Sequence, residues 1–285
     1  MILVTGASGS TGSEVVKRLS ARRVPVRAMV RRPPVQAHEA SSSVEYITAD
    51  FEDPVSLRRA LDGIERAFLV TNSSERTEAQ QLGFVDVART AGLRHIVYLS
   101  QLNATKNSPV RFLRYHAVVE DAISSTGIAF THLRPNLFMQ GYLAFRSSIA
   151  STGQFFAPVG DAAVSIVDVR DIAAVAAAAL TESGHEGKIY DVTGPEALTH
   201  TGMASQLSDA LGKQVAFIDI SESAMREALI GHGFPEWQAE GLIEDYAHYR
   251  RGEASSVSSA VLDVTGQPAR AFLTFARDFR DAFLN

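Results

Sequence analysis

Residues 1–12 read MILVTGASGSTG, an apolar run followed at once by three glycines at intervals of three residues. The apolar run predicts a short buried strand, Ile2–Thr5, and the glycines lead into a helical pattern near Thr11–Ala21. A strand, a G-x-x-G-x-x-G turn and a helix in this order are typical of a dinucleotide-binding loop. The alternative is a glycine-rich turn without a ligand, and the flanking strand and helix argue against it.

Each glycine of this loop has its own physical reason. Gly6 permits the tight turn, Gly9 lets the backbone approach a pyrophosphate, and Gly12 lets the helix pack closely on the strand. The free N–H groups at the start of the helix then face the anion. We therefore predict cofactor contacts from the loop residues Gly6, Ser8, Gly9, Ser10, Thr11 and Gly12.

The end of the second predicted strand, Val26–Val30, discriminates between the two nicotinamide dinucleotides. An Asp or Glu at this point holds the ribose 2′-hydroxyl of NAD. The sequence continues instead with Arg31 and Arg32, and a guanidinium suits a 2′-phosphate through paired hydrogen bonds. We predict NADPH as the cofactor, with NADH as the second choice. The alternative is a pair of ordinary solvated arginines.

Outward from the loop, the first half of the chain alternates short β-rich runs with helical patterns. This alternation predicts βαβ units, and so an α/β protein with a Rossmann-type doubly wound parallel sheet. The predicted strands are Ile2–Thr5, Val26–Val30, Val44–Thr48, Ala67–Thr71, His95–Ser100 and Ala129–Leu133. The predicted helices lie near Thr11–Ala21, Pro54–Leu61, Arg76–Ala91 and Arg111–Thr126, three of them followed by glycines at 63, 92 and 127.

After Pro135 the pattern changes, and helical segments dominate. We predict a dinucleotide-binding core from residues 1–135 plus 161–195, and a smaller, mostly helical C-terminal substrate lobe from residues 136–160 plus 196–285. The later elements predicted are a strand and alanine-rich helix over Val164–Leu180, a strand at Lys188–Val192, and helices at Thr199–Leu211, Ser221–His232, Gln238–Tyr249 and Arg270–Leu284.

Other predicted contacts follow strands, because ligands of open α/β sheets lie beyond the carboxyl ends of the strands. We place Asp50-Phe51 at the adenine edge and Thr71-Asn72 at the nicotinamide ribose. The nicotinamide ring is expected near Pro135-Asn136-Leu137. Each of the first two pairs is equally compatible with an ordinary turn, and Asp50 with a cap for the helix at Pro54.

Composition restricts the class of protein further. The net charge is −5 and the chain has no cysteine, which argues against direct nucleic-acid binding, disulfides and thiol chemistry. The longest apolar stretch, Ile172–Leu180, is too short to span a bilayer, and the residues from Met1 onward predict no signal peptide. The histidines lack metal-ligand spacing. We expect a cytoplasmic protein without metal and without membrane contact, and leave a homodimer open.

Seven segments together resemble one protein family: LVTGASGSTG, ADFEDPVSL, HIVYLS, HAVVEDAISSTGIAFTHLRPNLF, DVRDIA, GKIYDVTGPEALT and GEAS. The family is that of the NmrA-like atypical short-chain dehydrogenases, and within it the chain is similar to triphenylmethane dye reductases and type 2 NAD(P)H:quinone oxidoreductases. The resemblance covers essentially the whole chain. It implies a Rossmann core, NAD(P)H use without flavin, and a pocket between the core and the smaller lobe.

One departure from ordinary short-chain dehydrogenases concerns the catalytic acid. Those enzymes use Tyr-x-x-x-Lys on the helix after the fifth strand, whereas here Tyr115 is followed at four residues by Val119. His116 and Glu120 share one helix face instead, a pattern that resembles the dye and quinone reductases. His116 is a candidate proton donor or acceptor-binding residue, or else part of a helix-surface ion pair with Glu120.

The remaining candidates are less specific. Ser100 matches a substrate-binding serine of the relatives or simply ends its strand, and Tyr115 is more typical of packing than of catalysis. Phe138, Phe155 and Trp237 are candidate walls of the acceptor pocket and equally plausible core residues. We interpret Asp168, Arg170 and Asp171 as a strand-to-helix cap and a lobe anchor.

The resemblance and the residues together predict an NAD(P)H-dependent reductase. Its substrate would be a small aromatic or quinonoid molecule, so that hydride passes to a conjugated acceptor such as a quinone, an azo dye or a triphenylmethane dye. The alternative, which the same family contains, is an NADP(H)-binding redox sensor with little catalytic activity.

Overall fold

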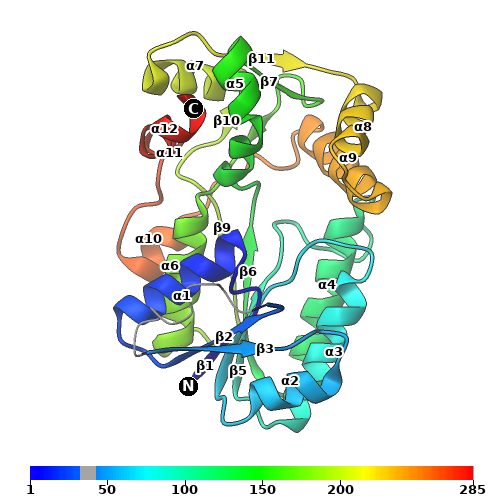
Figure 1. The fold of residues 1–285 in the computed structure, drawn as a ribbon, viewed down its shortest axis with the longest axis vertical. Helices are drawn as coiled ribbons and strands as arrows, with labels where there is room; N and C mark the ends of the chain where they lie inside the picture. Colours follow the sequence, from blue (N-terminus) through cyan, green and yellow to red (C-terminus); the bar gives the residue numbers. More distant parts are fainter. Residues whose placement is uncertain (33–42, 285) are drawn as a thin grey trace. The chain divides into compact units, whose positions relative to one another are not determined.

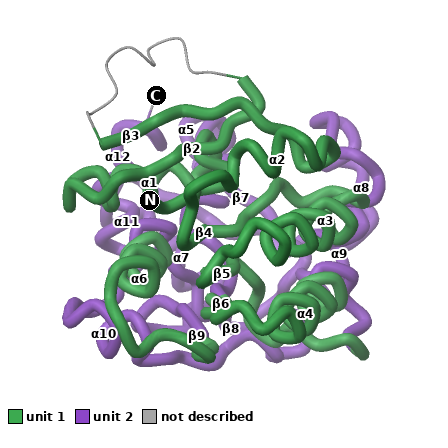
Figure 2. The backbone as a smooth tube through the Cα atoms, turned by 90° about the horizontal axis from the view of Figure 1, so that it is seen from below, with its two compact units in different colours: residues 1–107, 113–134, 172–190 green, residues 108–112, 135–171, 191–285 purple. Residues whose placement is uncertain are grey.

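The structure, a computed structural model, describes residues 1–32 and 43–284. It divides into two compact units, drawn in different colours in Figure 2. Unit 1 comprises residues 1–107, 113–134 and 172–190, and unit 2 comprises residues 108–112, 135–171 and 191–285. In the described residues, no helix combines the length and the apolar character that crossing a membrane requires.

A seven-stranded parallel sheet carries unit 1, with strand order β3-β2-β1-β4-β5-β6-β9. The order reverses at β1, where the chain steps first toward β2 and β3 and then back to β4, as in the predicted doubly wound sheet. The strands are β1 (Ile2–Val4), β2 (Val26–Val30), β3 (Val44–Thr48), β4 (Arg66–Leu69), β5 (His95–Leu99), β6 (Ala129–Pro135) and β9 (Lys188–Val192). The predicted fold class is confirmed.

Helices cover both faces of this sheet. In Figure 1, α1 (Ser10–Ala21) and α6 (Val169–Thr181) lie on one face, and α2 (Pro54–Leu61), α3 (Thr77–Thr90) and α4 (Arg111–Ser124) on the other. Between the sheet and α2–α4 lies a core that includes Leu57, Phe84, Tyr98 and Ile123, all fully buried. Burying this much apolar surface is the main favourable term in forming such a unit.

The ends of these helices are set by local chemistry. Asp53 caps α2, because its side chain accepts a hydrogen bond from the Val55 N–H, and Pro54 occupies the first turn. Gly63, Gly92 and Gly127 have φ values of 70°, 75° and 81°. Glycine adopts this left-handed conformation without steric cost, so the predicted helix stops at these residues are confirmed.

Unit 2 is largely helical and has a core of its own, built around buried aromatic side chains such as Tyr142, Phe155, Phe272 and Phe275. Its helices are η2 (Met139–Phe145, a 3-10 helix), α5 (Arg146–Thr152), α7 (His200–Leu211), α8 (Glu222–Gly231), α9 (Glu236–Arg250), α10 (Ala260–Thr265), α11 (Phe272–Asp278) and α12 (Arg280–Leu284).

Two details of unit 2 differ from the prediction. It contains two small sheets: β7 (Gln154–Ala157) pairs with β11 (Ala216–Asp219), and β8 (Ala163–Val164) pairs with β10 (Leu198–Thr199). The single closing helix predicted over Arg270–Leu284 is wrong, because Phe279 ends α11 with φ −105°. After this break Phe283 is fully buried and packs against Phe275, so aromatic packing overrides the helical periodicity.

Candidate active site

The glycine loop between β1 and α1 is shaped by close backbone contacts. Gly6 has φ 56°, and a Cβ atom at Gly12 would lie 2.2 Å from the Gly6 carbonyl oxygen, so no larger residue fits there. A Cβ at Gly9 would be 3.3 Å from the same oxygen, a contact that a small shift relieves. Gly12 is therefore required by packing, whereas Gly9 is placed on the exposed rim of the loop.

The start of α1 is suited to an anion. Its N-cap residue is Gly9, which has no side chain to satisfy the first N–H groups of the helix. Free N–H groups and the positive end of the helix dipole together favour a phosphate at this position. The loop residues thus fit the pyrophosphate of a dinucleotide, as the sequence predicts.

Thr5 ties this loop to the neighbouring strand. Its hydroxyl donates to the Val70 carbonyl at 2.8 Å and accepts from the Val70 N–H at 2.8 Å. Gly6 also lies close to Val70, because a Cβ atom at Gly6 would be 2.9 Å from the Val70 side chain. The loop is thereby fixed beside the end of β4, a role for Thr5 that the sequence did not reveal.

The predicted adenine and ribose positions follow β2 and β3. Arg31 and Arg32 are exposed at the carboxyl end of β2. The Asp50 carboxylate accepts a hydrogen bond from the Glu52 N–H at 2.9 Å, and Phe51 packs against Phe84. The alternative that Asp50 caps α2 is wrong, because Asp53 does so.

Beyond β4 and β5, two hydroxyl groups lack partners. The Oγ atoms of Ser73 and Ser100 are buried and have no hydrogen-bond partner among the described residues. A buried hydroxyl left without a partner costs free energy, and a bound ligand would remove that cost. Since β4 and β5 are adjacent and parallel, both hydroxyls lie past the same edge of the sheet.

His116 lies on α4 and is bonded to Tyr98 of β5. Its Nδ1 atom is 2.7 Å from the Tyr98 hydroxyl, and the Tyr115 ring packs against it at a centroid distance of 4.3 Å. Burial lowers the pKa of His116 to about 3. The imidazole is therefore uncharged at neutral pH, which makes it a hydrogen-bonding group and a weak source of protons.

Glu120 has a partner other than His116. Arg134, at the end of β6, donates from Nε at 2.9 Å and from Nη2 at 2.5 Å to the two oxygens of the Glu120 carboxylate. Both His116 and Glu120 are buried. The alternative of a helix-surface ion pair between His116 and Glu120 is therefore wrong. The Glu120 carboxylate is neutralised by bidentate pairing with Arg134 instead.

Thr71 and Asn72 are held by α3. The Thr71 hydroxyl accepts from Gln81 Nε2 at 2.9 Å, and the Asn72 carbonyl accepts from the Thr77 hydroxyl at 2.7 Å. Gln81 in turn accepts a hydrogen bond from Tyr98 at 2.8 Å. The structure thus links the predicted Thr71 to the predicted His116 through Gln81 and Tyr98, which the sequence analysis did not single out.

The segment after β6 belongs to unit 2. Asn136 donates to the Ser165 hydroxyl at 2.9 Å and to the Ala254 carbonyl at 2.8 Å, and its own oxygen accepts from the Leu137 N–H. Its side chain therefore joins three segments of unit 2. The contacts of Pro135, Asn136 and Leu137 with the nicotinamide stay a prediction.

The Asp168 group has the structural role that the sequence indicates. The Asp168 carboxylate caps α6, because it accepts a hydrogen bond from the Arg170 backbone N–H at 2.8 Å. It also accepts from the Arg170 guanidinium. The Asp171 carboxylate accepts from the backbone N–H and the guanidinium of Arg270. These side chains join parts of unit 2 to one another, so the interpretation as a cap and an anchor is confirmed.

The proposed aromatic walls have different environments. Phe155 is fully buried in the core of unit 2, which favours the core alternative for this residue. Trp237 packs against Phe112, and the Arg111 guanidinium lies 5.5 Å from the Trp237 ring. Phe138 forms an isolated bridge with Val167.

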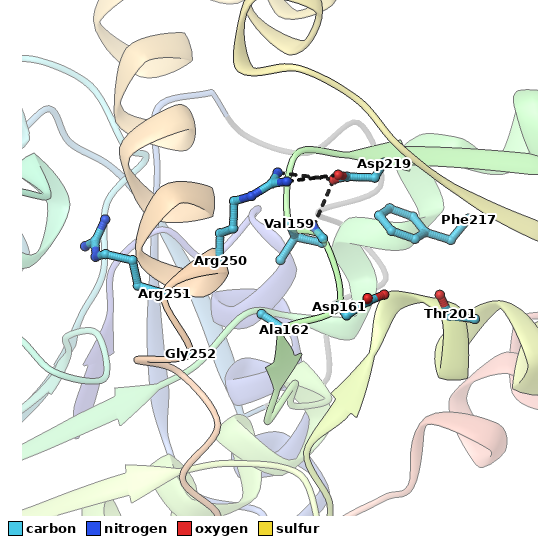
Figure 3. Close-up of a pocket in the computed structure, with 10 residues that line it drawn as sticks. Val159, Asp161, Ala162, Thr201, Phe217, Asp219, Arg250, Arg251 and Gly252 are labelled. Atoms are coloured by element: carbon cyan, nitrogen blue, oxygen red, sulfur yellow. Dashed lines mark hydrogen bonds and ion pairs between the residues drawn. The ribbon is translucent and has the colours of Figure 1, made fainter.

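Unit 2 also contains a cavity of about 790 Å³ that none of the predicted residues lines. Figure 3 shows Arg250 directed at Asp219, with an Nη2–Oδ2 distance of 3.1 Å. Asp219 also accepts from the Gly160 N–H at 2.8 Å. Asp161 and Thr201 lie near each other below the Phe217 ring (Figure 3). The charges here are largely paired with each other.

No metal site is formed in residues 1–32 and 43–284, since no three His, Asp or Glu side chains gather there. The described residues of unit 1 thus provide a glycine loop before α1, an uncharged histidine on α4 and unpartnered hydroxyls past the ends of β4 and β5. Residues 1–266 match the model of the NmrA-like family. The chain belongs to the NmrA-like family. The resemblance to NmrA-like proteins that the sequence motifs indicated is thereby confirmed.

Two curated relatives of this NmrA-like chain match it over almost their full length. An NAD(P)H azoreductase of Xenophilus azovorans is 36% identical over 283 residues, covering 99% of each chain. A (4-alkanoyl-5-oxo-2,5-dihydrofuran-3-yl)methyl phosphate reductase of Streptomyces griseus is 39% identical over 284 residues, again covering 99% of each.

Solved structures of the family agree with this fold. The Escherichia coli quinone oxidoreductase QOR2, in complex with NADPH, has a TM-score of 0.88 at 30% identity and covers 98% of this chain and 99% of its own. The Citrobacter triphenylmethane reductase, in complex with NADP(H), has a TM-score of 0.85 at 29% identity and covers 99% of this chain and 100% of its own.

Proposed function

We propose that this protein is an NAD(P)H-dependent reductase of conjugated acceptors. The relatives carry the names of an azoreductase, a quinone oxidoreductase, a triphenylmethane reductase and a reductase of an unsaturated lactone. These names share a substrate in which the reduced bond belongs to a conjugated system. The acceptor of this chain is accordingly a quinone, an azo dye, a triphenylmethane dye or a related small aromatic molecule.

One observation carries the proposal: the loop of Gly6, Gly9 and Gly12 at the start of α1. Its backbone contacts exclude a side chain at Gly12, and its uncapped helix start suits a pyrophosphate. NADPH is the preferred dinucleotide in this proposal, because Arg31 and Arg32 stand where a 2′-phosphate would be bound. No flavin and no metal take part.

The chemistry divides between the cofactor and the chain. When bound, NADPH would supply a hydride to the acceptor; a quinone or an azo compound then takes up a proton from solvent to complete the two-electron reduction, whereas a cationic triphenylmethane dye needs the hydride alone. The chain orients the two planar molecules and excludes water. The hydride adduct of a quinone or an azo compound is a delocalised anion, so a Tyr-Lys acid is dispensable and a neutral His116 suffices.

The remaining site assignments belong to the same proposal. Asp50 and Phe51 contact the adenine half of the cofactor, Thr71 and Asn72 the nicotinamide ribose, and Ser100 the acceptor. The buried, unpartnered hydroxyl of Ser100 supports that role. We further propose that residues 136–160 and 196–285 supply the substrate-covering lobe, and residues 1–135 and 161–195 the cofactor core.

The test is NADPH oxidation by the purified full-length chain with a panel of quinones, azo dyes and triphenylmethane dyes. We expect turnover with at least one class and, in Gly9→Ala, a loss of turnover that follows the loss of NADPH affinity. Tight NADPH binding without turnover of any acceptor would instead favour the alternative of a redox sensor. A preparation with flavin absorbance would contradict the flavin-free mechanism.

A further inference from the structure

A buried chain of hydrogen bonds in unit 1 ends at His116. Gln81 Nε2 donates to Thr71 Oγ1 at 2.9 Å, and the Tyr98 hydroxyl donates to Gln81 Oε1 at 2.8 Å. The Tyr98 oxygen is 2.7 Å from His116 Nδ1. Gln81 is 2% exposed and Tyr98 is fully buried, so water does not compete for these bonds.

The direction of this chain fixes where the imidazole proton lies. A tyrosine hydroxyl has one proton, and here it is donated to Gln81. The Tyr98 oxygen therefore accepts from His116, which requires the proton on Nδ1. In a neutral imidazole the other nitrogen, Nε2, then carries the lone pair. Burial keeps both groups uncharged at neutral pH, because it lowers the pKa of His116 and raises that of Tyr98.

The two other buried histidines in the described part of unit 1 provide a comparison. Nδ1 of His95 and Nδ1 of His132 are both buried without a partner among the described residues. Burial of a histidine in this sheet therefore does not by itself supply a partner for Nδ1. His116 differs because its Nδ1 is bound to a chain anchored through Tyr98 and Gln81.

We infer that Tyr98 and Gln81 are positioning residues: they hold His116 in the Nδ1–H tautomer, so that Nε2 accepts a hydrogen bond from an O–H or N–H group of the acceptor. This inference rests on the proposed reductase function. His116 is 9% exposed as a whole residue, and the inference requires that part of this exposed surface belongs to Nε2. The substrate class is thereby narrowed to conjugated acceptors that carry a hydroxyl or amino donor.

The first experiment measures the tautomer in the full-length protein. Nitrogen-15 NMR of labelled histidine distinguishes Nδ1–H from Nε2–H, and the His116 signal is assigned by its loss in His116→Gln. We expect Nδ1–H in the wild type at pH 7 and a change of tautomer in Tyr98→Phe. An Nε2–H signal in the wild type, or an unchanged signal in Tyr98→Phe, would overturn the inference.

A matched control is available on β9. Tyr190 makes the same kind of contact, with its hydroxyl 2.9 Å from His185 Nδ1. Tyr190→Phe therefore removes a second tyrosine–histidine hydrogen bond without touching the chain to His116. We expect the His116 signal to be unaffected in this variant, and a shift as large as that in Tyr98→Phe would overturn the inference.

The second experiment compares 2-amino-1,4-naphthoquinone, a neutral N–H donor at pH 7, with its N,N-dimethyl derivative, which has no N–H. We expect wild-type kcat/KM to favour the amino compound about three- to tenfold, mainly through KM, as one neutral hydrogen bond allows. The preference should fall toward one in Tyr98→Phe and Gln81→Leu, and persist in Tyr190→Phe. Equal preference in the wild type and Tyr98→Phe overturns the inference. If the wild type reduces neither compound nor any dye, the reductase function fails, and the NMR result still decides the tautomer.

Discussion

At the scale of the residue, the proposed function assigns cofactor choice to Arg31. We expect the wild type to bind NADPH more tightly than NADH, and Arg31→Ala to weaken NADPH binding by about 10- to 100-fold, because hydrogen bonds to a charged group contribute about 1.5–3 kcal/mol. Fluorescence titration of both cofactors measures this. Arg89→Ala, an exposed arginine on α3, serves as the control. Equal affinities of the wild type for the two cofactors would contradict the prediction.

His116 gives a second prediction at the residue scale. Because burial lowers its pKa to about 3, the ring does not titrate between pH 5 and pH 8. We expect no ionisation from His116 in the pH profile of kcat across that range. Because the neutral ring offers a hydrogen bond and not a titrating acid, His116→Ala should slow acceptor reduction by no more than about a hundredfold, the lower end of what general acid catalysis contributes, with NADPH affinity unchanged.

A complete loss of turnover in a folded His116→Ala protein would show that His116 is an essential acid. Circular dichroism and NADPH titration establish that the variant is folded. An activity that falls with a pKa near 6.5 in the wild type, and not in His116→Ala, would likewise contradict a neutral histidine.

Only part of this site could be predicted from the sequence. The loop at Gly6 is local, so its spacing is visible in a few residues. The chain from Gln81 through Tyr98 to His116 joins α3, β5 and α4, and β5 is buried along its whole length. In such a strand, periodicity does not tell which buried side chain will find a polar partner.

At the scale of the element, the start of α1 contains one glycine that packing requires, Gly12, and one that the proposed function assigns to cofactor binding, Gly9. A Cβ at Gly12 would lie 2.2 Å from the Gly6 carbonyl oxygen, against 3.3 Å for Gly9. We expect Gly12→Ala to lower the free energy of unfolding by about 1–3 kcal/mol, as overpacking does. Gly9→Ala should change it by less than about 1 kcal/mol and still weaken NADPH binding at least tenfold.

Urea denaturation and cofactor titration of the two variants measure both effects. We expect Gly12→Ala to lose both stability and NADPH affinity, and Gly9→Ala to lose NADPH affinity alone. Unimpaired NADPH binding by a folded Gly9→Ala protein would show that the pyrophosphate does not approach this backbone.

Helix α9 carries a similar close contact inside unit 2. A Cβ at Gly241 would lie 2.3 Å from the Phe112 ring. We expect Gly241→Ala to destabilise the protein by about 1–3 kcal/mol, and Phe112→Leu in the same chain to restore part of this loss. Thermal unfolding of the single and double variants measures the coupling. Additive losses would mean that the two side chains do not compete for space.

Helix boundaries were predictable where a glycine or a cap marks them, and the strands β2 and β3 also have the predicted bounds. Gly63 and Gly92 identify the ends of α2 and α3 because their backbone conformation is confined to a few residue types. The strands β7 and β11 have only four residues each and pair over a long sequence separation. Nothing local distinguishes them from irregular chain.

At the scale of the whole molecule, buried histidines contribute to the response to acid. Burial lowers the pKa of His95, His132 and His200 to about 4, against about 6.5 in an unfolded chain. Between these values the unfolded state binds protons that the folded state does not, so stability is full above pH 6.5 and falls as the pH drops toward 4.

His200 allows this to be tested at one residue. Both of its ring nitrogens are buried without a partner in the described part of the chain, and its ring lies 5.1 Å from that of Phe217. We expect His200→Phe to reduce the acid loss of unfolding free energy by about 3 kcal/mol between pH 6.5 and pH 4. Urea denaturation across this range measures it, with exposed His232→Phe as the control. Parallel curves for the wild type and His200→Phe would contradict the prediction.

The division of the chain between the two units bears on how the protein is made and inherited. The polypeptide leaves unit 1 at Arg134 and returns to it only at Ile172. During synthesis on the ribosome, residues 135–171 of unit 2 are therefore made before β9, the last strand of the seven-stranded sheet along the chain. A gene truncated after residue 134 would encode a sheet without β9 and without α6 on its face. Unit 1 is therefore not one continuous stretch of the gene, and a recombination event that moved all of it would carry residues 135–171 of unit 2 as well, in keeping with relatives that align from end to end.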